Sequence, residues 1–203
     1  MAFQSYAEEL VPGDTKDTND IFARDRQTGT TERVSVSSSE TQANDLSFAS
    51  FSTYIAGDGR FVSFSSFAKN LVRGDANGQP DVFLRDRQRG TTEMISVNSQ
   101  EVQGNWHSTT SAVSANGRLV AFGSHADNLA PQDINGLEDI FLRDRRAGTT
   151  VQVSVSSGGI GGNLPSHEPN IAADGSAVSF DSESNNLVPN DDNQLYDVFV
   201  YER

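Results

Sequence analysis

Short apolar runs separated by polar turn residues predict strands along the whole chain. Typical runs are Arg118–Phe122, Asp139–Arg143 and Val151–Val155. They are rich in β-branched and aromatic residues and are bounded by Gly, Asn, Asp or Ser, which is typical of strands and hairpins. No window of ten or more residues sustains the apolar spacing of an amphipathic helix. The pattern therefore predicts an all-β protein.

The same strand pattern returns at a long, nearly fixed interval. The segment Asp81–Thr92 recurs as Asp139–Thr150 and Asp20–Thr31, and a fourth copy begins at Asp197. The leading aspartates are 61, 58 and 58 residues apart (20 to 81, 81 to 139, 139 to 197). A period of this kind indicates a repeat architecture. We expect one array over residues 1–203, with repeats at approximately 1–44, 45–104, 105–162 and 163–203.

One complete repeat contains four strand candidates, at 111–114, 118–122, 139–143 and 151–155. Turns such as Asn116-Gly117 accept the positive φ that a tight hairpin needs. A four-stranded sheet that cannot bury both of its faces alone is typical of a propeller blade. Walking the strands in order places both long loops of every repeat on one face. Since loops carry function, this face is the candidate binding surface.

Three motifs carry a resemblance to a known family. They are Ser-Ala-Asn-Gly-Arg-x-Val-Ala-Phe at 114–122, the repeated Asp-[Ile/Val]-Phe-Leu-Arg-Asp, and the closing Ser-Val strand. Together they resemble the TolB-type β-propeller, a WD-like repeat of bacterial proteins, over essentially the whole chain. The resemblance implies four-stranded antiparallel blades and a secreted, cell-surface or periplasmic location. It says little about activity, because propellers host many functions.

Counting strands predicts about four blades, of which the first lacks its first strand and the last lacks its fourth. Unpaired strand edges are normally avoided in proteins. Three alternatives follow: a second copy closes one ring of about eight blades, the missing blades belong to a longer chain, or four blades close on themselves. The first alternative makes the protein a homodimer.

The composition of the chain excludes several classes of binding partner. The 203 residues carry 15 Lys plus Arg against 28 Asp plus Glu, a net charge of 15 − 28 = −13. So acidic a surface disfavours nucleic acid and anionic membranes. No apolar run approaches the ~18 residues of a membrane span, and the first residues show no secretion signal. With no cysteine, disulfides and thiol catalysis are excluded.

The loop before each Asp-x-Phe strand resembles a shortened calcium loop of integrin-type propeller repeats. Asp75–Asp81 and Asp133–Asp139 place oxygen ligands at alternate positions, with a glycine and a closing carboxylate, as hard cations require. One central acidic ligand of those loops is missing. The predicted calcium ligands, including degenerate copies, are Asp75, Asn77, Asp81, Asp133, Asn135, Asp139, Asp191, Asn193, Asp197, Asp14, Asp17 and Asp20. The alternative is that these side chains cap turns and bond backbone amides.

The Arg-Asp-Arg triplets at 24–26, 85–87 and 143–145 repeat with the fold. We therefore expect a structural role for them, in salt bridges between blades or in hydrogen bonds to turn carbonyls.

Positions where the repeats differ are the candidates for partner binding. These are Trp106, His107, His167 and Glu168, in or near the loops between blades. An exposed aromatic beside a histidine suits sugar stacking or a protein contact, although Trp106 aligns with Leu164 and a packing role is the alternative. The three histidines occupy different repeat positions and would meet only across blades. Glu168 and Asp181 are the non-repeated acids that an active site at the channel mouth would use.

These observations favour a non-enzymatic binding or scaffold module. Its loop face would take a protein or glycan partner, with calcium stiffening the loops. The alternative function is a propeller enzyme, a glycan hydrolase or lyase acting at the channel mouth. An enzyme needs a few unique, convergent polar groups, whereas most acids of this chain are repeated.

Overall fold

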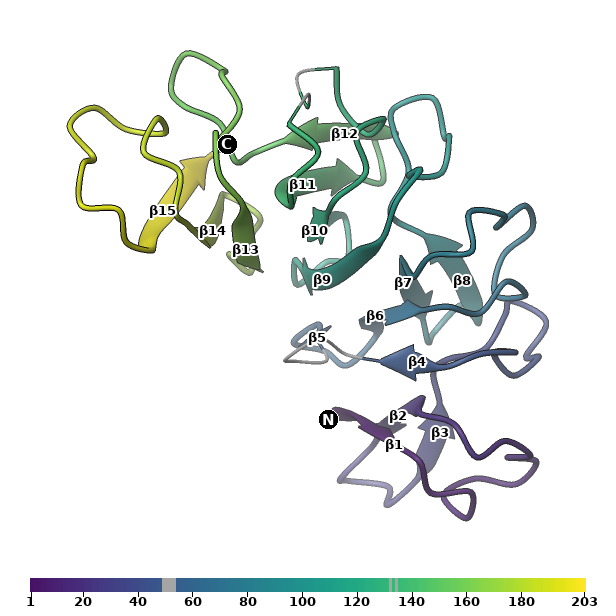
Figure 1. The fold of residues 1–203 in the computed structure, drawn as a ribbon. Coiled ribbons are helices and arrows are strands. Elements are labelled where there is room, and N and C mark those ends of the chain that lie inside the picture. The colour runs from purple at the N-terminus through teal and green to yellow at the C-terminus, as the bar shows by residue number, and fades with distance from the viewer. Residues whose placement is uncertain (49–53, 132, 134) are drawn as a thin grey trace.

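Four antiparallel sheets follow one another along an arc in the computed structural model, which describes residues 1–48, 54–131, 133 and 135–203 (Figure 1). The described residues contain strands and turns and no helix. Accordingly, no helix there is long and apolar enough to cross a membrane. The predicted all-β fold is confirmed.

Each sheet is built from one stretch of sequence. The first sheet contains β1 (Ala2–Ser5), β2 (Asp20–Arg24) and β3 (Thr31–Arg33). In the second, β4 (Ser47–Phe48) and β5 (Tyr54–Ile55) both pair with β6 (Phe61–Ser66), followed by β7 (Asp81–Asp86) and β8 (Thr91–Met94). The third contains β9 (Ser108–Val113), β10 (Leu119–Ser124), β11 (Asp139–Asp144) and β12 (Thr149–Gln152). The fourth contains β13 (Ser166–Ile171), β14 (Ala177–Ser182) and β15 (Asp197–Glu202). As predicted, the two end sheets have three strands each.

The outermost strands end earlier than the sequence indicated. We predicted a strand over Val151–Val155, but β12 covers Thr149–Gln152, and β3 in the first sheet likewise ends at Arg33, before Val34 and Val36. In the third sheet the amides of Val153 and Ser154 both point to the Ile140 carbonyl, at 2.8 and 3.4 Å. The Ser154 hydroxyl then accepts the Ile140 amide at 3.1 Å. Because one carbonyl accepts two amides and a side chain accepts the Ile140 amide, the regular strand pairing ends here. The alternation of apolar residues in the sequence does not reveal this end point.

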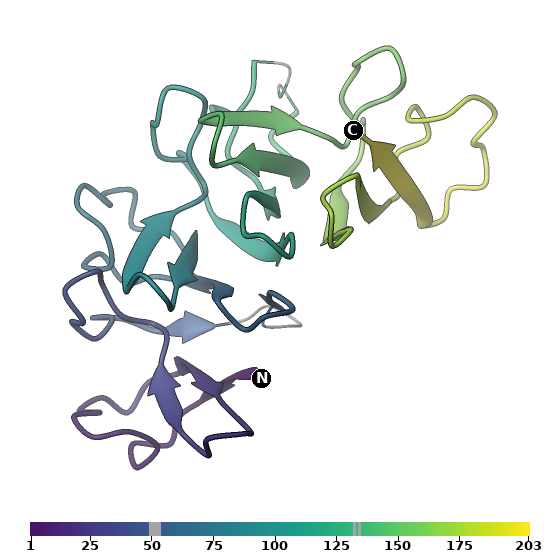
Figure 2. The same ribbon diagram turned by 180° about the vertical axis from the view of Figure 1, so that it is seen from behind.

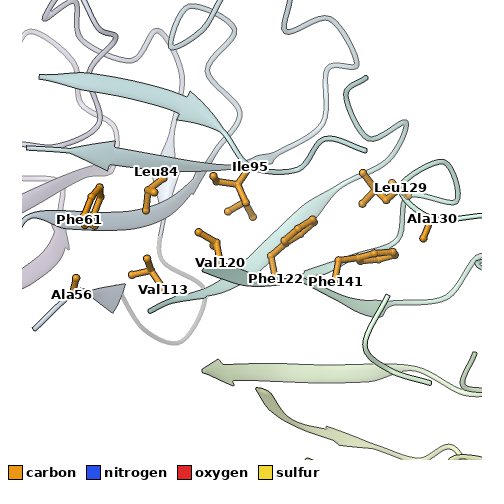
Figure 3. Close-up of a cluster of buried hydrophobic side chains, with 12 residues drawn as sticks. Ala56, Phe61, Leu84, Ile95, Val113, Val120, Phe122, Leu129, Ala130 and Phe141 are labelled. Atoms are coloured by element: carbon orange, nitrogen blue, oxygen red, sulfur yellow. The ribbon is translucent and has the colours of Figure 1, made fainter. Parts of the chain in front are cut away.

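The core lies between successive sheets. Figure 3 shows Phe122 and Phe141 of the third sheet in one buried cluster with Leu84 and Ile95 of the second. The Phe122 and Phe141 rings stack with centroids 5.7 Å apart. The same cross-strand phenylalanine pair recurs in every sheet, as Phe3–Phe22, Phe64–Phe83 and Phe180–Phe199. Burial of one repeated apolar face against the next sheet is thus what stacks the array.

The hairpin between β9 and β10 shows why its glycine is required. Gly117 has φ of 68°, in the left-handed region that glycine adopts without steric cost. A Cβ on this residue would also lie 2.4 Å from the Phe61 ring of the preceding sheet. The turn residue therefore fixes both the hairpin and the approach of two sheets.

Arginines of the second and third repeated triplets join adjacent sheets, as predicted, whereas Arg24 of the first triplet bonds Thr31 of its own sheet. Arg85 is buried and pairs with Glu40 at 2.5 Å while donating to the Ser37 carbonyl at 3.2 Å. Arg143 makes the same two contacts one repeat later, with Glu101 and the Asn98 carbonyl. Equivalent joints connect Arg87 to Glu32 and Arg145 to Glu93, and the same two arginines bond the turn carbonyls of Gly59 and Gly117.

The inner edge of the arc is formed by the first strand of each later sheet, including β9 and β13 (Figure 1). Seen from behind in Figure 2, the first and fourth sheets still stand at opposite ends of the arc. Four blades of this chain therefore do not close on themselves, which removes one of the three expected alternatives. The repeat boundaries stay a prediction.

Removal of one phenylalanine ring tests whether the stacked, buried pairs stabilise the array. We expect Phe141→Ala to lower the free energy of unfolding by roughly 3–5 kcal/mol, because it removes a fully buried ring and leaves a cavity. Urea unfolding followed by circular dichroism measures the change. Leu195→Ala is the control, since Leu195 is exposed and its loss should change stability by less than about 0.5 kcal/mol. Equal effects of the two variants would contradict the proposed core.

Candidate functional site

Polar side chains that break the repeat gather at the junction of the third and fourth sheets. They line a pocket of about 370 Å³, which we call the mouth pocket. Its lining residues are Thr109, Thr110, Glu138, His167, Glu168, Asp181 and Tyr196. All seven lie on the loop face, close to the loop-side ends of β9, β11, β13, β14 and β15.

An irregular stretch of β13 positions two of these residues. The register pairs His167 with Asp181 of β14 and then shifts between His167 and Asn170. Within the shift, Glu168 adopts φ of 53°, the left-handed region that is uncommon for residues other than glycine. Such a conformation costs on the order of 1–3 kcal/mol and is typical of functional sites. The bulge redirects side chains at the end of an otherwise regular strand.

A partly buried Glu138–His167 pair connects the two sheets. The distance from His167 Nδ1 to Glu138 Oε2 is 2.9 Å. Burial raises the pKa of Glu138, although the neighbouring His167 acts in the opposite direction. Gly123 makes room for the pair, because a Cβ there would lie 2.5 Å from both Glu138 Oε1 and Thr110 Oγ1. The pair is thus built into the junction between the two sheets.

Two further histidines lie beside the mouth pocket. The rings of His107 and His125 are 4.1 Å apart, and Trp106 lies 6.0 Å from His107. Burial, helped by the charges of His107 and His167, lowers the pKa of His125 to about 4. Trp106 is 49% exposed, so it does not fill the packing role that its alignment with Leu164 suggested. His107 precedes β9 and His125 follows β10, so their rings meet within the third sheet, contrary to the expectation that the histidines would meet only across blades.

The sequence found part of this site. His167, Glu168 and Asp181 line the mouth pocket, whereas Trp106 and His107 lie beside it. Sequence reasoning missed Glu138 and Tyr196. These two residues occupy the repeat position that holds Pro80 in the second sheet, directly before the Asp-x-Phe motif. A comparison of this single position across repeats would have found both.

The predicted calcium loops form carboxylate pairs with different surroundings. In the first sheet, Gln42 Nε2 bridges Asp14 and Asp20 at 2.9 and 2.8 Å, and Arg33 lies 3.2 Å from Asp14. Asp17 is exposed. The amide and guanidinium groups thus stand between the carboxylates of this copy.

In the second sheet an amide alone bridges the pair. Gln103 Nε2 is 2.8 Å from Asp75 Oδ1 and 2.7 Å from Asp81 Oδ2. Ser96 donates to the other Asp81 oxygen at 2.6 Å, and Asn77 caps the turn by accepting the Gln79 amide. Burial raises the pKa of Asp81 to about 6.

The third sheet has the same carboxylates without a bridge. Ser154 donates to Asp139 Oδ1 at 2.6 Å, and Asn135 caps its turn by accepting the Leu137 amide. The second Asp139 oxygen and both Asp133 oxygens are buried without a hydrogen-bond partner. Burial, together with the charge of Asp139, raises the pKa of Asp133 to about 6.

In the fourth sheet Asn193 donates to Asp197 at 2.8 Å, and Asp191 is half-buried. Among the residues that the structure describes, no three His, Cys, Asp or Glu side chains converge as a ready-made metal site. Any cation in these loops would therefore combine two carboxylates with amide oxygens or water.

Comparisons with known proteins identify the fold. No family model and no curated protein sequence matches the chain. Among solved structures, TolB from Acinetobacter baumannii superposes with a TM-score of 0.51 at 16% identity, covering 92% of this chain and 36% of that one. A second TolB-type protein, from Agrobacterium tumefaciens, gives 0.53 at 13% identity, covering 92% and 53%. An oligogalacturonate lyase in complex with manganese gives 0.51 at 14% identity, covering 84% and 43%.

These likenesses show a TolB-like β-propeller fold, and the chain spans about a third to a half of the two TolB-type structures. The fold accommodates both TolB and a lyase, so the comparisons leave the activity open. Function has to be argued from the mouth pocket and from the carboxylate pairs.

The lowered pKa of His125 is directly measurable. A proton titration followed by nuclear magnetic resonance should place the pKa of the His125 ring near 4. Because this pKa is lower than in the unfolded chain, the neutral ring contributes stability above about pH 6.5 that is lost as pH falls towards 4.

The variant His125→Phe copies Phe67, which holds this position in the second sheet, and should weaken the loss of stability on acidification. A His125 resonance that titrates near pH 6.5 would contradict this buried environment.

Proposed function

We propose that the chain is a non-enzymatic binding module whose mouth pocket receives a basic group of a protein partner. The observation that carries this proposal is the state of Glu168 and Asp181. Both line the mouth pocket, and neither forms an ion pair within the described residues. Glu138, in contrast, already has His167 as its partner.

Charge and aromatic character favour a cationic group in this pocket. A lysine or arginine side chain would form charge-assisted hydrogen bonds with the two carboxylates. The exposed Tyr196 ring adds a face for a cation. At long range, the net charge of −13 attracts a basic partner and raises its association rate.

A glycan is the second partner class. Trp106 is half-exposed beside His107, and aromatic rings of this kind stack on sugars.

The proposal also includes a location outside the cytoplasm. It further includes closure of the arc by a second copy of the chain or by further blades, which a measured solution mass against 21.9 kDa for one chain would test.

The competing function is a glycan hydrolase or lyase acting at the channel mouth. The Glu138–His167 pair favours it, since a carboxyl group with a raised pKa beside an imidazole is suited to proton transfer. We prefer binding because Glu168 and Asp181 in the same pocket would repel an anionic sugar polymer.

The proposal predicts charge-dependent peptide binding. Peptides with a central arginine or lysine should bind more tightly than versions with glutamine, as measured by fluorescence anisotropy. The double variant Glu168→Gln/Asp181→Asn should weaken binding by roughly tenfold or more, because it removes the two charged acceptors.

The matched control is Glu8→Gln/Glu9→Gln, which removes the same charge from exposed positions in the first sheet's long loop. It should leave affinity nearly unchanged. Equal losses in both double variants would show that only overall charge matters and would reject the pocket as the binding site. Turnover of a glycan that Glu138→Gln abolishes would instead establish the enzyme.

A further inference from the structure

The third sheet contains buried carboxylate oxygens whose counterparts in the first and second sheets are hydrogen-bonded. Gln42 and Gln103 bridge the carboxylate pairs of the first and second sheets. The residue at this repeat position in the third sheet is Gly161. The third sheet therefore lacks the glutamine that bridges the carboxylates in the first and second sheets, although its two aspartates are arranged as in the second sheet.

The unsatisfied atoms belong to residues that are almost completely buried. Asp133 is 5% exposed, and no donor lies in hydrogen-bonding geometry with either of its oxygens, although the nearby Asn135 backbone amide acts to lower its pKa. Asp139 is 0% exposed, and no donor lies in hydrogen-bonding geometry with its Oδ2, although the Gln152 and Asn135 side chains lie close enough to act to lower its pKa. Gln152 Oε1 is buried and unpartnered as well. Buried polar atoms are nearly always hydrogen-bonded in proteins, and an unpaired buried charge is far more costly than an unpaired amide. This concentration of acceptors in one place requires a donor or a cation.

Gln152 brings its amide to the space that Gly161 leaves. A Cβ on Gly161 would lie 3.1 Å from Gln152 Nε2 and 3.5 Å from Gln152 Oε1. The same repeat position holds Arg33 in the first sheet and Met94 in the second. The first sheet thus supplies a fixed positive charge, and the third supplies a neutral amide with a free oxygen.

We propose that Asp133, Asp139 and Gln152 form a calcium site that is confined to the third sheet. Two carboxylates neutralise the ion, and the free oxygens are both of Asp133, Oδ2 of Asp139 and Oε1 of Gln152. Calcium accepts six to eight oxygen ligands in irregular geometry, so about two to four waters complete the shell. Magnesium requires near-octahedral geometry, and zinc prefers nitrogen and sulfur ligands, which this site lacks.

The site has a consequence for the mouth pocket. Asp139 begins β11, and the residue directly before it is Glu138, which lines the mouth pocket and bonds His167. Calcium would tie the loop after β10 to β11 and β12 and so hold Glu138 in place. The calcium site itself is independent of which partner the mouth pocket receives.

Thermal unfolding in calcium against a chelator tests the proposal at constant ionic strength and pH. Calcium at a hundred times its Kd should raise the Tm by about 5–10 °C, because it binds only the folded chain. Isothermal titration with calcium chloride should give one site per chain. The variant Asp133→Asn/Asp139→Asn should lose both signals.

If removal of the carboxylates prevents folding, two further variants test the site by introducing residues that the first and second sheets have at these positions. Gln152→Met/Gly161→Gln copies the second sheet, and Gln152→Arg copies the arginine of the first. Each should raise the Tm in chelator and abolish the calcium response. Asp75→Asn/Asp81→Asn in the second sheet is the matched control and should leave the calcium response unchanged.

An unchanged Tm at millimolar calcium would overturn the proposal. A calcium response that survives in both copied variants would equally reject this site.

Discussion

A buried aspartate at the start of the third repeat strand is the constraint on which the rest of the array depends. Asp20, Asp81 and Asp139 are almost completely buried, and each accepts a hydrogen bond from a serine at the end of the next strand. The same serine hydroxyl accepts the backbone amide of the residue after the aspartate, as Ser96 does from Val82 at 3.2 Å. A carboxylate in this position thus ties the start of one strand, where the long loop re-enters the sheet, to the serine that follows the outer strand. It also leaves one oxygen that something else must satisfy.

Different side chains satisfy this second aspartate oxygen in different repeats. These differences give individual repeats their own potential binding sites. Arg33 and Gln42 neutralise and bridge the first pair, and Gln103 bridges the second. The third copy has Gln152 and Gly161 at these positions, so its acceptors remain free. A repeat protein can thus hold identical backbones while changing one or two side chains per copy. The structural carboxylate of one repeat becomes a potential ligand in the next.

Much of the fold could be predicted from the sequence because repetition reports the same strands several times. The period located all four sheets, and the Arg-Asp-Arg triplets indicated joints between sheets, such as Arg85 with Glu40. The ends of the outer strands could not be predicted, since Ser154 interrupts the ladder through its side chain rather than through hydropathy. The unsatisfied oxygens of Asp133 were also hidden, because they depend on the absence of a side chain at Gly161, in a different loop.

The mouth pocket could be only partly predicted, because its residues come from two neighbouring sheets. His167 and Glu168 stand out as sequence differences within one loop, but Glu138 reaches them from the neighbouring sheet through space that Gly123 leaves open. A glycine near the end of β10 and a glutamate before β11 have no separate signal in the sequence. Their part in the pocket is visible only in the structure, where Gly123 pairs with Ile140 and His167 of the next sheet contacts Glu138. In a stacked array, sites form at junctions between repeats. The informative comparison is therefore between one position and its neighbours in adjacent sheets, rather than between loops along the chain.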